Sequence, residues 1–234
     1  MSDIALFNID GFLFLMRWLH QVFGITWIGL LYYFNFVQGS FMAEADAGAK
    51  SAVTQKLLPR ALWWFRWAAM FTFLTGFTYI SIRASQGGMG MFATSWGACI
   101  TTGMALGTIM FLNVWLIIWP NQKIVIANAI DVAAGKPANP EAAKAAPRAL
   151  LASRTNTLFS IPMVFYMAGA RHLPLRTDET SNFMLLTILF AIIIGALELN
   201  AIKGKLGPLT TIRGVIHCGF GLAAVLYTVM EIVL

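Results

Sequence analysis

The sequence predicts an all-α fold, a polytopic bundle of about six transmembrane helices with both termini outside. Its composition is 59% hydrophobic and 11% charged, with a mean hydropathy of +0.73, whereas soluble domains carry roughly 25% charged residues. Apolar runs recur along the chain, several of them near the ~20 residues that a helix needs to cross a bilayer. We therefore treat residues 1–234 as a single transmembrane domain.

The first predicted span, Gly11–Val37, holds Arg17 and His20 inside its apolar run. An ionisable group in lipid costs roughly 2.5–3.5 kcal/mol on insertion scales, so such residues usually face the bundle interior and carry function. Residues three or four apart share a helix face, which puts Gly24 and Trp27 on the same stripe. A cation, an imidazole and a small-residue gap together suit a flat anionic cofactor or ligand.

Five further spans follow, and Pro120 is predicted to end the third span of the chain. Cytoplasmic loops are expected at about 38–60, 120–154 and 202–211. The longest loop is expected to contain an amphipathic helix around Ile126 and Ile130, and then a helix that begins near Asn139 and feeds into the fourth span. The later spans cover about 61–82, 94–119, 155–170, 183–201 and 212–234.

Lys and Arg residues predict the orientation, because cytoplasmic loops carry an excess of them. The second and fourth loops hold only Arg83, Arg171 and Arg176. The odd-numbered loops hold many more: Lys50, Lys56, Arg60, Lys123, Lys136, Lys144, Arg148, Arg154, Lys203, Lys205 and Arg213. This distribution puts the odd loops in the cytoplasm and both termini outside. It also argues against nucleic acid as a partner, because the positive charge is spread over separate loops.

Several polar residues fall in the cytoplasmic half of the predicted spans. One interpretation is structural: Arg66 and Glu198 neutralise each other and fix the packing of two helices. The other is a polar cavity in which Arg66 and nearby amides hold a planar, hydrogen-bonding anion. The substrate-binding candidates are Arg66, Asn113, Asn156 and Glu198, with Asn200 and His217 at similar depth.

The three histidines are candidate haem ligands. A b-type haem between helices needs one or two imidazoles, and His20 could be paired with His172 or with His217. Arg17 could neutralise a haem propionate or extend to the outer surface. The structural alternatives are an interfacial position for His172 and a helix contact for His217. A covalently attached c-type haem is excluded by the lack of CxxCH.

Three stretches of the chain together carry a resemblance to one protein family: RWLHQVFGITWIGLLYYFNFVQ around His20, GTIMFLNVWLIIWPNQK around Asn113, and SRTNTLFSIPMVFYMAGARH ending at His172. They resemble, in the same order, the membrane domain of the bacterial membrane-bound urate oxidase (urate hydroxylase) family. The resemblance implies a helical membrane domain that oxidises a purine and passes electrons to a cytochrome c. The positions that carry over are His20, Asn113, Trp115, Asn156 and His172.

Two departures from the family pattern bear on this expectation. Thr155 stands where the RxNT-like stretch of the family is associated with a histidine. The cytochrome c that the family typically carries after the last span is not part of this sequence, so the electron acceptor is expected to be a separate protein.

The function that the sequence predicts is a membrane redox protein that oxidises a purine-like substrate and passes electrons through haem b at His20 to a separate cytochrome c. The main alternative is a non-catalytic or electron-transfer subunit of a larger respiratory or redox complex in the lipid bilayer. A transporter is a third class, but the sequence shows no inverted repeat to support it.

Overall fold

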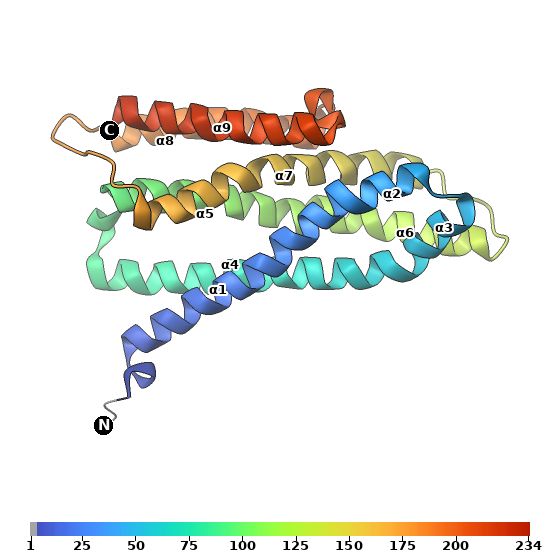
Figure 1. Cartoon of the computed structure of the whole chain (residues 1–234), viewed down its shortest axis with the longest axis horizontal. Coiled ribbons are helices and arrows are strands. Elements are labelled where there is room, and N and C mark those ends of the chain that lie inside the picture. Colours follow the sequence, from blue (N-terminus) through green and yellow to red (C-terminus); the bar gives the residue numbers. More distant parts are fainter. Residues whose placement is uncertain (1–3) are drawn as a thin grey trace.

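The computed structural model describes residues 4–234, and within them the chain forms helices and short connections without a β-strand. Figure 1 shows an elongated bundle whose long helices run back and forth along one axis. The long elements are α1 (Ile9–Tyr32), α4 (Leu58–Gly87), α5 (Ser95–Leu112), α6 (Trp119–Ala133), α7 (Ala142–His172), α8 (Phe183–Lys203) and α9 (Ile212–Val233). The third long helix is composite, because the π-helical segment η5 (Asn113–Ile118) joins α5 to α6 without a break.

The remaining elements are short and lie at the ends of the long helices: η1 (Ala5–Phe7), η2 (Tyr33–Gln38), α2 (Gly39–Glu44), α3 (Ala47–Ala52), η3 (Val53–Leu57), η4 (Met89–Phe92) and η6 (Gly207–Thr210). Polar side chains fix where several long helices begin. Asn8, Thr94, Asn182 and Thr211 each accept a hydrogen bond from a backbone N–H of the first helical turn, as expected of N-cap residues.

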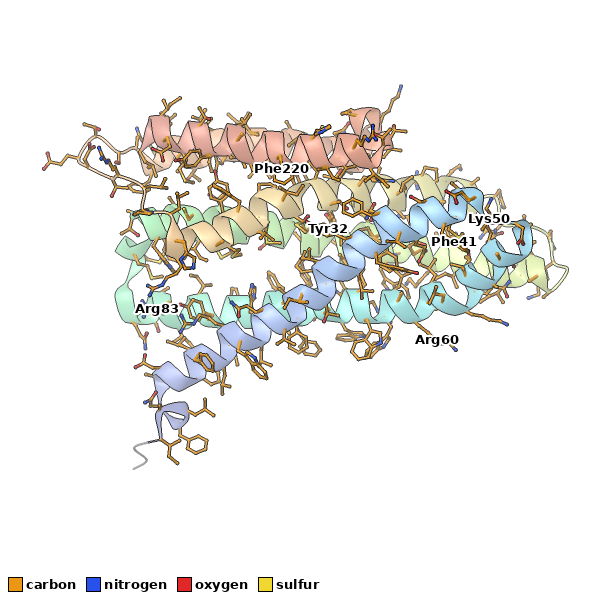
Figure 2. All side chains as sticks on the ribbon, in the orientation of Figure 1. Tyr32, Phe41, Lys50, Arg60, Arg83 and Phe220 are labelled. Carbon is orange, nitrogen blue, oxygen red and sulfur yellow. The ribbon has the colours of Figure 1, made fainter. Side chains whose placement is uncertain are left out.

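The connections α1–α4, α6–α7 and α8–α9 gather at one end of the bundle, which we call the basic end (Figure 1). The α4–α5 and α7–α8 connections lie at the opposite end, together with the first described residues and the C-terminus. Lys50 and Arg60 lie at the basic end and Arg83 at the other (Figure 2). The alternation of loops expected from the sequence is therefore present in the fold.

Helix α7 is the central element. It packs against α5, α6, α8 and α9, whereas α1 packs mainly along α4. The side chains of Phe159 and Tyr166 are fully buried on α7, and so is the amide of Asn156. Two prolines, Pro147 and Pro162, lie inside α7, so the expected feeding of one helix into the fourth span takes the form of one unbroken helix.

The expectation that Pro120 ends the third helix is wrong. The helix continues to Ala133, and the amphipathic segment around Ile126 is part of this continuation. Proline normally breaks a helix because it lacks an N–H and its ring clashes with the carbonyl four residues earlier. Here the turn before it is widened: the backbone N–H of Trp119 reaches the carbonyl of Val114. A π-turn of this kind leaves the Pro120 ring room within the helix.

Three helices are long and apolar enough to cross a membrane by length and composition: Ser95–Ala133, Phe183–Lys203 and Ile212–Val233. The other three expected spans, in α1, α4 and α7, are long enough but are not among the helices that are also apolar enough. Helix α4 includes Arg60, Arg66 and Arg83, and α7 begins with a basic first half. The described residues thus confirm an all-helical protein with three span-capable helices.

Candidate functional site

Three of the polar residues predicted to lie together do meet in the bundle. Asn113, in η5, donates from Nδ2 to Oδ1 of Asn156 at 2.9 Å and to Oε2 of Glu198 at 3.0 Å. The Nδ2 group of Asn156 in turn donates to the carbonyl oxygen of Met110 at 2.9 Å. Asn113 and Asn156 are buried. The cluster joins the third helix, α7 and α8, and leaves the Glu198 carboxylate with one amide donor.

The other three predicted members lie elsewhere. The Arg66 guanidinium lies over the ring of Trp119, 3.9 Å from its centroid. Asn200 bonds to the backbone of Lys205 at the end of α8, and His217 is exposed on α9. The predicted ion pair between Arg66 and Glu198 is not among the ion pairs of residues 4–234, which are Lys136–Asp131 and Lys144–Glu141. Arg66 stacks on an aromatic face instead, a usual alternative partner for arginine.

A small polar cavity of about 160 Å³ lies at the basic end, where η2, α2, α4, α6 and α7 converge. Its polar wall consists of Asn35, Gln38, Gln122 and Ser153. Asn35 is buried and donates from Nδ2 to the carbonyl of Leu31 at 2.9 Å and to Oγ of Ser153 at 2.8 Å. The Oε1 atoms of Gln38 and Gln122 are buried and have no hydrogen-bond partner among residues 4–234.

The sequence predicted a polar cavity formed by Arg66, Asn113, Asn156 and Glu198, but none of these residues lines this cavity. The signal was present in the sequence, since Asn35 interrupts the apolar run of the first helix. Two π-helical segments border it: η2 contributes Asn35 and Gln38, and η5 contributes Ile118. Such segments are often found at functional sites. Arg66 and Trp119 directly follow the lining residues Phe65 and Ile118 in sequence.

His20 is held at the interface of α1 and α4. Its Nδ1 lies 2.8 Å from the carbonyl oxygen of Thr72. Its ring lies against Gly76, because a Cβ built on this glycine would come within 2.9 Å of Cε1 and Nδ1 of His20. A carbonyl oxygen only accepts, so Nδ1 carries the proton and the lone pair of the neutral ring is on Nε2. A ring nitrogen of this kind, with its partner nitrogen bonded to a carbonyl, is the usual state of a metal-ligating histidine.

The fit of a haem to these residues is partial. His20 offers one nitrogen, but His172 is exposed at the end of α7 and His217 is exposed on α9. Among the described residues, no group of three or more His, Cys, Asp or Glu side chains could hold a metal ion. Neither the polar cavity nor a larger apolar cavity of about 640 Å³ between α5 and α8 has a histidine in its wall. Arg17 lies over the Tyr79 ring, 5.5 Å from its centroid.

Long, apolar helices, an amide–carboxylate cluster and a small polar cavity at one end define an all-helical, membrane-associated protein. The chain belongs to the urate oxidase N-terminal family, whose profile matches residues 79–203, more than half of its length. The matched segment includes Asn113, Asn156 and Glu198, whereas His20 lies outside it. No curated protein and no solved structure is similar enough to this chain to match it.

Proposed function

We propose that the protein is a membrane oxidoreductase of the urate oxidase type that binds an anionic, purine-like substrate in the polar cavity at the basic end. The observation that carries this proposal is the pair of unpartnered glutamine oxygens, on Gln38 and Gln122, in a cavity of about 160 Å³. Urate is flat and presents several ring N–H groups. Buried carbonyl oxygens without donors are the groups that such N–H bonds satisfy, and leaving them unmet is costly.

The residues around the cavity supply the other features of a purine site. The rings of Phe34 and Phe65, both in its wall, meet edge to face with centroids 5.3 Å apart, which forms a rigid apolar side. Arg66 is the cation that we assign to the substrate's negative charge. Asn113, Asn156 and Glu198 form a separate polar cluster outside the wall of the cavity. The Glu198 carboxylate, held by Asn113, is the group that we assign to accept a proton from the substrate.

Electron transfer is the second part of the proposal. His20 would hold a b-type haem through Nε2, with Arg17 near a propionate and His172 or His217 as a second ligand after rearrangement. A haem at this position would supply one-electron transfer to a separate cytochrome c. The expected topology is six spans in the bacterial inner membrane, with both termini outside and the basic end in the cytoplasm.

An accessory role in a larger redox complex is the alternative, and one observation favours it. At Thr155, where the family resemblance leads us to expect a histidine, the hydroxyl donates to the carbonyl of Leu151 at 3.1 Å and is buried. The Thr155 side chain therefore bonds within its own helix, α7, in this chain. A subunit that retained the bundle without a full ligand set would show this pattern.

The test is urate binding and urate-dependent reduction of added cytochrome c by the detergent-purified chain. Gln122→Met should weaken urate binding at least tenfold, because it removes one of the two free oxygens at nearly constant volume. The control is Gln21→Met, which makes the same change at an exposed position on α1. Binding with no reduction would favour the accessory role, and no binding to the unaltered chain would refute the proposed substrate site.

A further inference from the structure

Arg154 is a buried cation without a hydrogen-bond or ion-pair partner among residues 4–234. Only 9% of its surface is exposed, although the sequence places it in a basic loop. Its Nε and Nη1 atoms are buried and make no hydrogen bond to any group among residues 4–234. The side chain extends from the first half of α7, the central helix of the bundle.

Other arginines of this protein have interaction partners for their guanidinium groups. Arg17 lies over the ring of Tyr79 and Arg66 over the ring of Trp119. Arg60 is exposed and donates to the carbonyl of Lys56 at 3.1 Å. Arg154 has neither an aromatic face nor such an acceptor. Burying a charge without a counter-charge or hydrogen bonds is strongly unfavourable, so its position calls for an anion that is not part of this chain.

Helix α9 packs on this side of α7 at Gly219, about two turns from its start. Leu158 shares the face of Arg154 one turn further along, and a Cβ on Gly219 would come within 3.1 Å of the Leu158 carbonyl oxygen. Helices α7 and α9 both start at the basic end and run in the same direction (Figure 1). The N-terminus of α9, at Ile212, therefore lies near the level of Arg154. A helix N-terminus carries partial positive charge, which makes an anion still more favourable there.

The Glu198 carboxylate on α8 accepts a hydrogen bond from Asn113 and forms no ion pair with Arg154. The connection between α8 and α9 adds only positive charge, from Lys203, Lys205 and Arg213. No charge within this part of the bundle neutralises Arg154.

We propose that Arg154 binds an oxyanion between α7 and the N-terminal turns of α9. A guanidinium presents planar N–H donors that match the oxygens of a phosphate or carboxylate. Two sources share this chemistry: a free oxyanion such as inorganic phosphate, and the phosphate of an anionic lipid, for which basic pockets between helices are known sites. This site is separate from the purine cavity and does not depend on the proposed redox function.

The test is the thermal stability of the full chain, measured against each source. Inorganic phosphate is titrated onto detergent-purified protein, and the melting temperature is compared between nanodiscs of phosphatidylglycerol and of phosphatidylcholine. A saturable rise with phosphate identifies a free oxyanion, and a higher melting temperature in phosphatidylglycerol identifies the lipid. In either case Arg154→Met should remove the effect. Arg148→Met, an exposed arginine on the same helix, should retain it.

Two results would overturn the proposal: no response of the unaltered chain to either probe, or an equal response in Arg154→Met. If Arg154→Met does not fold, Arg154→Lys replaces it, because a lysine keeps the charge and loses the planar donors. Its apparent affinity for the effective probe should then fall at least tenfold, and an unchanged affinity would count against Arg154. Neither probe is a purine, so the result is independent of urate binding.

Discussion

The Nδ1 atom of His20 donates a hydrogen bond to the carbonyl oxygen of Thr72 over 2.8 Å, joining α1 to α4 across 52 residues of sequence. The bond fixes both the tautomer and the orientation of the ring. It leaves Nε2 as the nitrogen that can bind a metal. The His20 ring also packs against Gly76. Whether the His20 imidazole binds a haem therefore determines whether the proposed electron transfer is correct.

Replacing His20 with Ala should abolish or shift a b-type haem spectrum, because it removes the one histidine whose second nitrogen is held by the backbone. The measurement is a reduced-minus-oxidised absorption spectrum of the purified chain. His172→Ala and His217→Ala serve as comparisons, and whichever of them also alters the spectrum identifies the second ligand. A spectrum unchanged by His20→Ala would exclude this residue as a ligand.

Replacing Gly76 with Ala should displace the His20 ring, since the new Cβ would lie 2.9 Å from two ring atoms. We expect a loss of stability of about 1–3 kcal/mol, typical of overpacking, together with a change in any haem spectrum. Gly24→Ala is the matched control, because its Cβ would meet only the Thr72 methyl group at 3.9 Å. Equal effects of the two substitutions would contradict the proposed contact.

Replacing Asn113 with Ala should destabilise the bundle by about 1–3 kcal/mol, because it leaves the buried oxygen of Asn156 and the half-buried carboxylate of Glu198 without their donor. Unfolding in detergent, followed by circular dichroism, measures this loss. Asn121→Ala is a suitable comparison, as this amide bonds only to the Ile117 carbonyl of its own helix and should cost less.

Arg66→Gln and Glu198→Gln should act independently, since the two residues do not form an ion pair. Their effects on unfolding free energy should add to within about 0.5 kcal/mol, as for sites without a shared partner. A larger coupling energy in the double mutant would restore the ion pair that the sequence suggested.

Asp46 should contribute to the acid sensitivity of the protein. Backbone N–H groups of Ala49 and Gly48 stabilise its carboxylate at the start of α3 and hold its pKa below the usual 3.8. A lowered pKa stabilises the fold above the unfolded value, and this contribution is lost as the pH falls through the folded pKa. Asp46→Asn keeps the cap, so its melting temperature should change less than that of the unaltered chain below about pH 4. A parallel decline would argue against the cap.

The sequence was sufficient for the helices and their order because long apolar runs bounded by capping residues leave few alternatives. Loops rich in Lys and Arg also predicted which connections share an end. The continuation of the third helix past Pro120 could not be predicted from the sequence, because the π-turn that accommodates the proline depends on the backbone of the preceding residues. The helical extensions beyond η2 and η5 were expected only as surface helices or loops, whereas the start of α7 was expected as a helix that feeds into the fourth span.

The candidate site was predicted in part. Asn113, Asn156 and Glu198 were expected at one depth, and depth along a helix is readable from sequence. Arg66 was expected with them, but the rotational position of a side chain depends on how the helices pack, and this turned Arg66 toward Trp119. For the same reason neither the cavity residues Gln38 and Gln122 nor the burial of Arg154 could be found from hydropathy, which assigns such residues to loops.

The length of the composite third helix bears on how a ligand reaches the polar cavity from the aqueous phase. Its 39 residues extend about 58 Å at 1.5 Å per residue, nearly twice the ~30 Å hydrocarbon thickness of a bilayer. Gln122 lies past the middle of this helix, on the part that extends toward the basic end. A molecule bound beside Gln122 can therefore exchange with the aqueous phase on that side. In sealed vesicles the protein should respond to a membrane-impermeant urate solution on one face only, so its chemistry would have a direction across the membrane.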